Sequence, residues 1–211
     1  MLAIFDMDGT LVDSSVTLVN SINYVRGKLG LEPLAKQIIL EQINNPECNL
    51  AKFFYETDEI TDKHEKWFKE YYSRNHDKEL VIFDGVELML QNLKNKGIKI
   101  ALATNAYRDS TMEALKHLNI ENYFDDIICY DEVDNGKPAP DMLLALLNRN
   151  SPKRALFIGD SDRDMLAAKA ANLEFLRVAL GSNDRKTITK ADILERKIVD
   201  FLYNKNNLVK G

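Results

Sequence analysis

The 211-residue sequence has few cysteines, no long apolar run and no basic block, and each absence argues against a class of protein. Cys48 and Cys129 are isolated and form no C-x-x-C pair, so we expect two reduced thiols in a cytosolic protein rather than a zinc site or a disulfide framework. No apolar run reaches the ~18 residues of a membrane span. A net charge of −5 without clustered Lys and Arg argues against a nucleic-acid binder.

The composition is that of an ordinary globular chain, with 45% apolar and 29% charged residues. An acid at position 6 interrupts the region where a secretory leader would need a positive charge and an apolar stretch. We therefore expect no signal peptide, and a cytoplasmic location. The length allows one large domain, or a main domain with a smaller insertion.

Five short apolar runs predict buried parallel strands, at residues 2–5, 98–104, 126–130, 155–159 and 174–180. Helical patterns lie between the later runs. The first of these helices is expected to begin at Asp84 as its N-cap and to end at Gly97, and the last to end at Asn172. The alternation predicts an α/β fold with a Rossmann-like parallel sheet.

The connection after the first strand is too long for a crossover helix. About 90 residues separate Asp6 from the next strand at Ile98, whereas a crossover needs about a dozen. Residues 16–80 show helical stripes and no convincing strand. We therefore expect a core domain over 1–15 and 81–211 with an inserted helical cap over 16–80, and we expect this cap to stand over the carboxyl edge of the sheet.

Polar residues follow four of the predicted strands, where parallel strands share one edge. In chain order these polar residues are Asp6, Asp8, Thr104, Asn105, Lys137, Asp160 and Asp164, and Gly9 forms a tight turn among them. Carboxylates are the oxygen ligands that Mg²⁺ prefers, while a lysine, a hydroxyl and backbone amides can hold a phosphoryl group. The sequence therefore predicts a magnesium and phosphate site at this edge.

Formal charge supports the pairing of a metal with a phosphate. Ionised Asp6, Asp160 and Asp164 together with a phosphate dianion carry more negative charge than Mg²⁺ and Lys137 can neutralise. We expect the metal-free site to bind phosphate poorly, and we expect Asp8 to stay protonated because this avoids further repulsion.

Four motifs give a specific resemblance. DMDGTLVDS at the start, TN at 104–105, KPAPD and GDSDRD occur in this order. They resemble the motifs of the haloacid dehalogenase superfamily, specifically its phosphatases with a helical cap between the first two motifs, and the phosphoglycolate phosphatases among them. The match runs from Leu2 to about Leu180. It implies a Mg²⁺-dependent phosphomonoester hydrolase that acts on a small phosphorylated metabolite.

The resemblance also implies a role for each matching residue. Asp6 would be the nucleophile that forms an aspartyl-phosphate, and Asp8 the general acid and then the general base. The metal would be held by Asp6, Asp160 and the main-chain carbonyl of Asp8, with Asp164 close by through water. The phosphoryl oxygens would be held by Thr104, the Asn105 amide and Lys137, and Gly9 would let the backbone approach them.

Several alternatives stay open. A β-phosphoglucomutase-like phosphotransferase would retain both acids, but the histidine that those enzymes carry after the first motif is missing from SSVTLVN. An inorganic pyrophosphatase would have the same build. A dehalogenase is disfavoured because those relatives lack an acid at the position of Asp8. A phosphate-sensing module such as a receiver domain would lack the DGT and GDSxxD elements and the cap.

The cap is expected to select the substrate. INNPECNLAK at 43–52 stands where phosphoglycolate phosphatases have a glycine-bearing loop, and position 106, often Lys in that family, is Ala. Because of these departures the sequence does not identify the substrate. It does not indicate the oligomeric state either. The residues expected to face the leaving group are Asn45, Glu47, Asn49 and Lys52.

Overall fold

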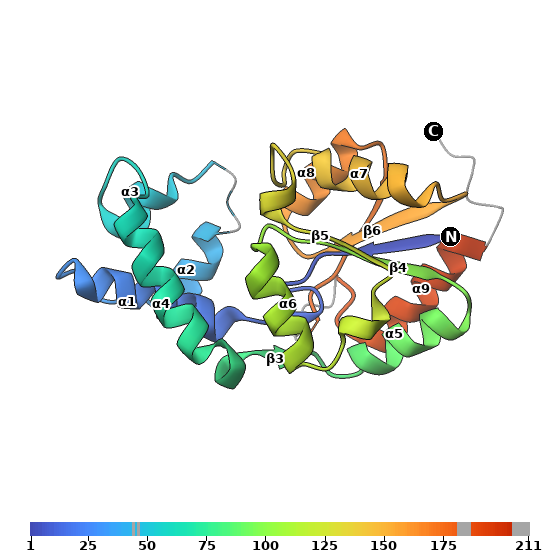
Figure 1. Cartoon of the computed structure of the whole chain (residues 1–211), viewed down its shortest axis with the longest axis horizontal. Coiled ribbons are helices and arrows are strands. Elements are labelled where there is room, and N and C mark those ends of the chain that lie inside the picture. Colours follow the sequence, from blue (N-terminus) through green and yellow to red (C-terminus); the bar gives the residue numbers. More distant parts are fainter. Residues whose placement is uncertain (44, 46, 181–186, 204–211) are drawn as a thin grey trace. The chain divides into compact units, whose positions relative to one another are not determined.

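The chain forms two compact units (Figure 1), and its structure is a computed structural model that describes residues 1–43, 45, 47–180 and 187–203. The core unit consists of Met1–Val12 and Ile82–Gly211, and the helical unit of Asp13–Val81. The boundary falls within a two-stranded sheet of β2 (Val12–Asp13) and β3 (Val81–Ile82).

A five-stranded sheet forms the centre of the core unit, in the order β5-β4-β1-β6-β7. The central strand β1 (Leu2–Phe5) pairs in parallel with β4 (Lys99–Ala103) and β6 (Ala155–Gly159). The outer strands, β5 (Asp126–Ile128) and β7 (Glu174–Arg177), are also parallel to their neighbours. The predicted α/β, Rossmann-like class is confirmed.

The strand β1 is apolar throughout because both faces of the sheet are covered. All four of its residues are fully buried, which is the pattern of a parallel strand between two layers of helices. Helices α7 (Asp141–Asn150) and α8 (Asp162–Ala170) cover one face, and α5 (Val86–Asn95) and α9 (Ala191–Tyr203) cover the other (Figure 1).

Three strands are shorter than the apolar runs predict. The run at 126–130 leaves the sheet after Ile128, and Tyr130 begins a 3-10 turn, η2 (Tyr130–Glu132). The side chain of Glu132 accepts a hydrogen bond from the Cys129 amide at 2.9 Å, which fixes this turn. The strands predicted at 98–104 and 174–180 are also shorter, since β4 covers only Lys99–Ala103 and β7 only Glu174–Arg177. A strand ends where its backbone hydrogen bonds end, and apolar residues can continue beyond that point.

The predicted helix boundaries are partly correct. Gly97 and Asn172 have the left-handed backbone expected at a helix end, with φ of 70° and 53°. The N-cap predicted at Asp84 is wrong, since Gly85 occupies that position with φ of 79° and α5 starts at Val86. A left-handed cap favours glycine over a side chain that accepts a hydrogen bond. The core unit also contains α6 (Arg108–His117) and η1 (Glu121–Tyr123).

The helical unit has its own apolar core. It contains α1 (Ser15–Lys28), α2 (Lys36–Ile43), α3 (Leu50–Tyr55) and α4 (Asp62–Glu79). The stripes seen in the sequence meet in one cluster, whose buried members are Val19, Ile22, Val25, Ile39, Phe54 and Tyr55. None of the described helices combines the length and the apolar character that a membrane span requires.

Candidate active site

The first strand ends immediately before Asp6, and the chain then turns instead of continuing. The Asp6 amide donates to the Ile158 carbonyl at 2.9 Å, and its side chain is buried at the carboxyl end of β1. Gly9 closes the turn with φ of 80°, and a Cβ there would lie 2.3 Å from the Oδ2 of Asp160. Only glycine fits this position, because both the backbone angle and the space exclude a side chain.

Three carboxylates gather at this edge of the sheet. One oxygen from each of Asp6, Asp160 and Asp164 can be chosen so that all lie within 4.8 Å of one another. The buried hydroxyl of Thr10 lies 3.3 Å from Asp6 Oδ2 and 3.3 Å from Asp160 Oδ1. A hydroxyl has one proton, so Thr10 can donate to only one of these carboxylates at a time.

Lys137 is the cation inside this cluster. Its Nζ donates to Asp6 Oδ1 at 2.5 Å, to Asp164 Oδ1 at 2.6 Å and to the Ala103 carbonyl at 3.0 Å, so all three ammonium protons have acceptors. The side chain of Asn105 holds the backbone of this lysine from the end of β4, with one bond donated and one accepted, both at 2.8 Å. Asn105 therefore fixes the position from which Lys137 reaches the carboxylates.

Asp164 is fixed from both sides. One of its oxygens accepts from Lys137, while Oδ2 accepts from the Ser161 amide at 3.1 Å and the Ser161 hydroxyl at 2.6 Å. Ser161 and Asp164 form the capping box that begins α8. A Cβ on Gly159 would come within 2.7 Å of the Asp164 side chain, so glycine makes room for it. The Ser-x-x-Asp spacing could have indicated this capping role from the sequence.

Burial and crowding shift the pKa values of the cluster. Burial, with repulsion from Asp164 and Asp160, raises the pKa of Asp6 well above its usual value, although Lys137 opposes the shift. Burial and repulsion from Asp164 raise the pKa of Asp160 to about 6. Burial alone would lower the pKa of Lys137, but attraction from Asp6 and Asp164 raises it. One permanent cation thus faces three carboxylates, an arrangement that favours a further cation.

The remaining predicted residues divide between the two units. Thr104 is buried at the end of β4, where its Oγ1 accepts from the Ala106 amide at 3.1 Å, and Asp8 is half-buried in the turn after β1. The residues predicted to face the leaving group belong to the helical unit and are exposed: Asn45, Glu47, Asn49 and Lys52. Asn49 caps α3, and Asn45 accepts a bond from the Glu47 amide at 3.0 Å.

The chain is similar to known proteins over most of its length. A "Phosphorylated carbohydrates phosphatase" of Thermotoga maritima is 32% identical over 198 residues, which cover 89% of each chain. A pyrophosphatase of Halalkalibacterium halodurans is 28% identical over 94% of each chain. The crystal structure of a predicted phosphoglycolate phosphatase from Haemophilus somnus aligns with a TM-score of 0.76 at 27% identity, covering 93% of this chain and 97% of that one. The family model for haloacid dehalogenase-like hydrolases matches residues 3–178. The chain belongs to the haloacid dehalogenase-like hydrolase family and is an enzyme with phosphatase relatives.

Proposed function

We propose that this hydrolase releases phosphate from a small phosphorylated metabolite in a Mg²⁺-dependent reaction through an aspartyl-phosphate on Asp6. The observation that carries the proposal is the cluster of buried Asp6, half-buried Asp160 and buried Asp164 around Lys137. The names of the relatives, a phosphorylated carbohydrate phosphatase and a phosphoglycolate phosphatase, support a phosphomonoester as the substrate. A cytoplasmic location belongs to the same proposal.

The carboxylate cluster fits a magnesium ion. Its oxygens are close enough together to ligate one cation, and Mg²⁺ is held by few carboxylates and several waters. As the family resemblance implies, Asp6 and Asp160 would be the direct side-chain ligands, together with the Asp8 main-chain carbonyl. Asp164 would act through water. When bound, the ion would offset the charge of the phosphoryl group.

The protein residues would then divide the reaction between them. A carboxylate oxygen of Asp6 attacks phosphorus, so that a P–O bond to Asp6 forms and the bond to the leaving oxygen breaks. Asp8 donates its proton to that oxygen and later takes a proton from the water that attacks the aspartyl-phosphate. Phosphate leaves and Asp6 is regenerated. Lys137, Thr104 and the amides near Gly9 and Asn105 hold the phosphoryl oxygens throughout.

The helical unit would serve as the cap of this enzyme. Asn45, Glu47, Asn49 and Lys52 stay the predicted contacts to the leaving group, and substituting them one by one should change the ratio of kcat/KM between two substrates. For Asn49 the capping bond to the Lys52 amide adds a structural cost, so its variant also needs a stability measurement.

A second candidate function is hydrolysis of inorganic pyrophosphate. It is favoured by the named activity of the pyrophosphatase relative, which matches the chain over nearly its whole length. Comparing kcat/KM for pyrophosphate with kcat/KM for a panel of phosphomonoesters separates the two candidates.

Replacing the nucleophile tests the proposal. Asp6→Asn should abolish phosphate release from p-nitrophenyl phosphate and from every ester in the panel, and wild-type activity should need Mg²⁺. Asp162→Asn is the matched control, because Asp162 is an exposed acid on α8 that pairs with Arg177. Turnover retained in Asp6→Asn, or wild-type activity unchanged by removal of divalent ions, would contradict the proposal.

A further inference from the structure

Two tyrosines form an exposed aromatic pair beside the proposed phosphate-binding residues. Tyr107 lies directly before α6, just after β4, and Tyr130 begins η2 after β5. Their ring centroids are 5.7 Å apart with an interplanar angle of 62°, an edge-to-face arrangement. They remain 42% and 43% exposed. Both follow the carboxyl ends of adjacent strands, which is the edge where ligands bind in sheets of this type.

The pair is held on the same backbone segments as the phosphate-binding residues. The Tyr130 amide donates to the Ala106 carbonyl at 3.0 Å, which ties the loops after β4 and β5 together. A Cβ on Gly136 would lie 2.6 Å from Cδ2 of Tyr130 and 2.8 Å from Oδ1 of Asn105. The Tyr130 ring therefore packs directly on the residue before Lys137, and its position is fixed relative to that lysine.

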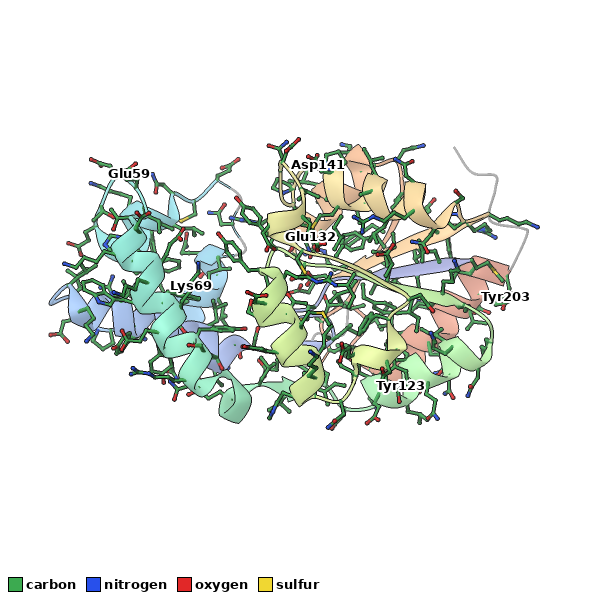
Figure 2. All side chains as sticks on the ribbon, viewed as in Figure 1. Glu59, Lys69, Tyr123, Glu132, Asp141 and Tyr203 are labelled. Atoms are coloured by element: carbon green, nitrogen blue, oxygen red, sulfur yellow. The ribbon has the colours of Figure 1, made fainter. Side chains whose placement is uncertain are left out.

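The surface next to the pair is predominantly negative, with four carboxylates and Arg108, which pairs with Glu132 at 3.3 Å. A shallow hollow in the same loop is lined by Asp131, Glu132, Val133, Asp134 and Asp141. Figure 2 shows Glu132 and Asp141 at the end of the core unit where the strands finish. These carboxylates would repel a second anionic group on a substrate, whereas aromatic faces attract the apolar face of a neutral ring.

We propose that Tyr107 and Tyr130 are specificity-determining residues that pack against the ring of the leaving group, and that the preferred substrates are monophosphorylated sugars without a second anionic group. This inference rests on the proposed function, since it needs the phosphoryl group to be bound at Asp6 and Lys137. It assigns part of the substrate selection to the core unit, in addition to the helical unit.

The test compares a ring-bearing substrate with acyclic ones. The wild-type enzyme should have a higher kcat/KM for glucose 6-phosphate than for glycerol 3-phosphate or phosphoglycolate. Tyr130→Ala and Tyr107→Ala should each lower kcat/KM for glucose 6-phosphate roughly tenfold, the scale of one lost apolar contact, and change the acyclic values less than about twofold. Tyr130→Phe keeps the ring and should keep the preference.

Tyr203→Ala is the control, because Tyr203 is an exposed tyrosine on α9 whose hydroxyl bonds to the Lys96 carbonyl. Equal losses for ring-bearing and acyclic substrates, or a wild-type preference for an acyclic ester, would overturn the inference but leave the proposed function intact. If the wild type releases phosphate from no ester at all, the proposed function fails and the inference fails with it.

Discussion

The core unit and the helical unit both bury a cation, but they satisfy it differently. In the core unit Lys137 donates to two carboxylates, Asp6 and Asp164. In the helical unit Arg26 is 6% exposed and donates to the main-chain carbonyls of Glu32 at 2.7 Å and Phe54 at 2.5 Å. Carboxylates can bind protons or a metal instead of the lysine, whereas main-chain carbonyls cannot titrate. The carboxylates around Lys137 can therefore take part in a reaction, whereas the carbonyls around Arg26 serve to stabilise the fold.

Among the variants that compare the two units, Lys137→Met should have the largest effect. Removing one fixed donor to a reacting phosphoryl group should lower kcat/KM by roughly 10²–10³-fold. The free energy of unfolding should fall less than in the Arg26→Met variant. Asp6 has a raised pKa, so its carboxyl can take up a proton when Lys137 is lost. Steady-state kinetics and thermal unfolding measure the two effects, with the exposed Lys169→Met as the control. A stable Lys137→Met enzyme with normal kcat/KM would show that Lys137 is not needed for the reaction, and would contradict the proposed difference between the two cations.

The reverse pattern is expected for Arg26→Met. Loss of charged hydrogen bonds to two main-chain carbonyls, of which that of Phe54 is buried, should lower the free energy of unfolding by about 2–3 kcal/mol. The folded fraction should retain the wild-type kcat, because this arginine supports the helical unit and not the carboxylate cluster. Urea unfolding and kinetics at low temperature measure this. Arg74→Met is the control, since Arg74 is exposed on α4 and pairs with Glu70. A fall in kcat without a loss of stability would contradict the assignment.

A smaller effect is expected for Thr10→Val, which removes a donor shared by Asp6 and Asp160. The variant has nearly the same shape but removes the one proton that Thr10 donates to either carboxylate, so kcat/KM should fall roughly tenfold and the Mg²⁺ concentration for half-maximal activity should change. Thr10→Ser should restore both values. If Thr10→Val and Thr10→Ser behave alike, the hydroxyl has no part in positioning the carboxylates.

The smallest effect is expected for the pH dependence of the stabilisation by Mg²⁺. Burial and repulsion from Asp164 raise the pKa of Asp160 to about 6, above the unfolded value near 3.9, so its stabilising contribution in the metal-free protein is lost as pH rises through 6. Mg²⁺ binds the deprotonated carboxylates. The thermal shift caused by Mg²⁺ should therefore be small at pH 5.5 and reach a few degrees at pH 7.5. An equal shift at both pH values, or in Asp160→Asn, would argue against this metal site.

The fold class follows from local sequence, but element ends do not. The fully apolar run of β1 predicts a strand between two helical layers, as observed. Tyr130 looks like the end of a strand in the sequence, yet it starts η2, because the Glu132 side chain captures the Cys129 amide. Whether a backbone group pairs with a strand or with a side chain depends on contacts that apolar spacing does not encode.

The candidate site could also be predicted only in part from the sequence. Strand ends predict that Asp6, Lys137, Asp160 and Asp164 meet at one edge, and these side chains do lie together. Their chemical roles stay predictions. The hydrogen bond between Thr10 and Asp160 joins residues that are 150 positions apart, and the Asn105 clamp on Lys137 spans 32. Neither contact has a periodic signature, so they could be seen only once the strand register was known.

Trapping the covalent intermediate tests the central claim most directly. Asp8→Asn should slow hydrolysis of the aspartyl-phosphate, since Asp8 is proposed to activate the water, while p-nitrophenol leaves readily without an acid. After p-nitrophenyl phosphate and Mg²⁺ are added and the reaction is quenched in acid, mass spectrometry of the peptide that contains Asp6 should show one added phosphoryl group. The adduct should be absent without Mg²⁺ and absent in the variant that carries both Asp6→Asn and Asp8→Asn. Release of p-nitrophenol with no adduct on Asp6, or an adduct on another residue, would contradict the account.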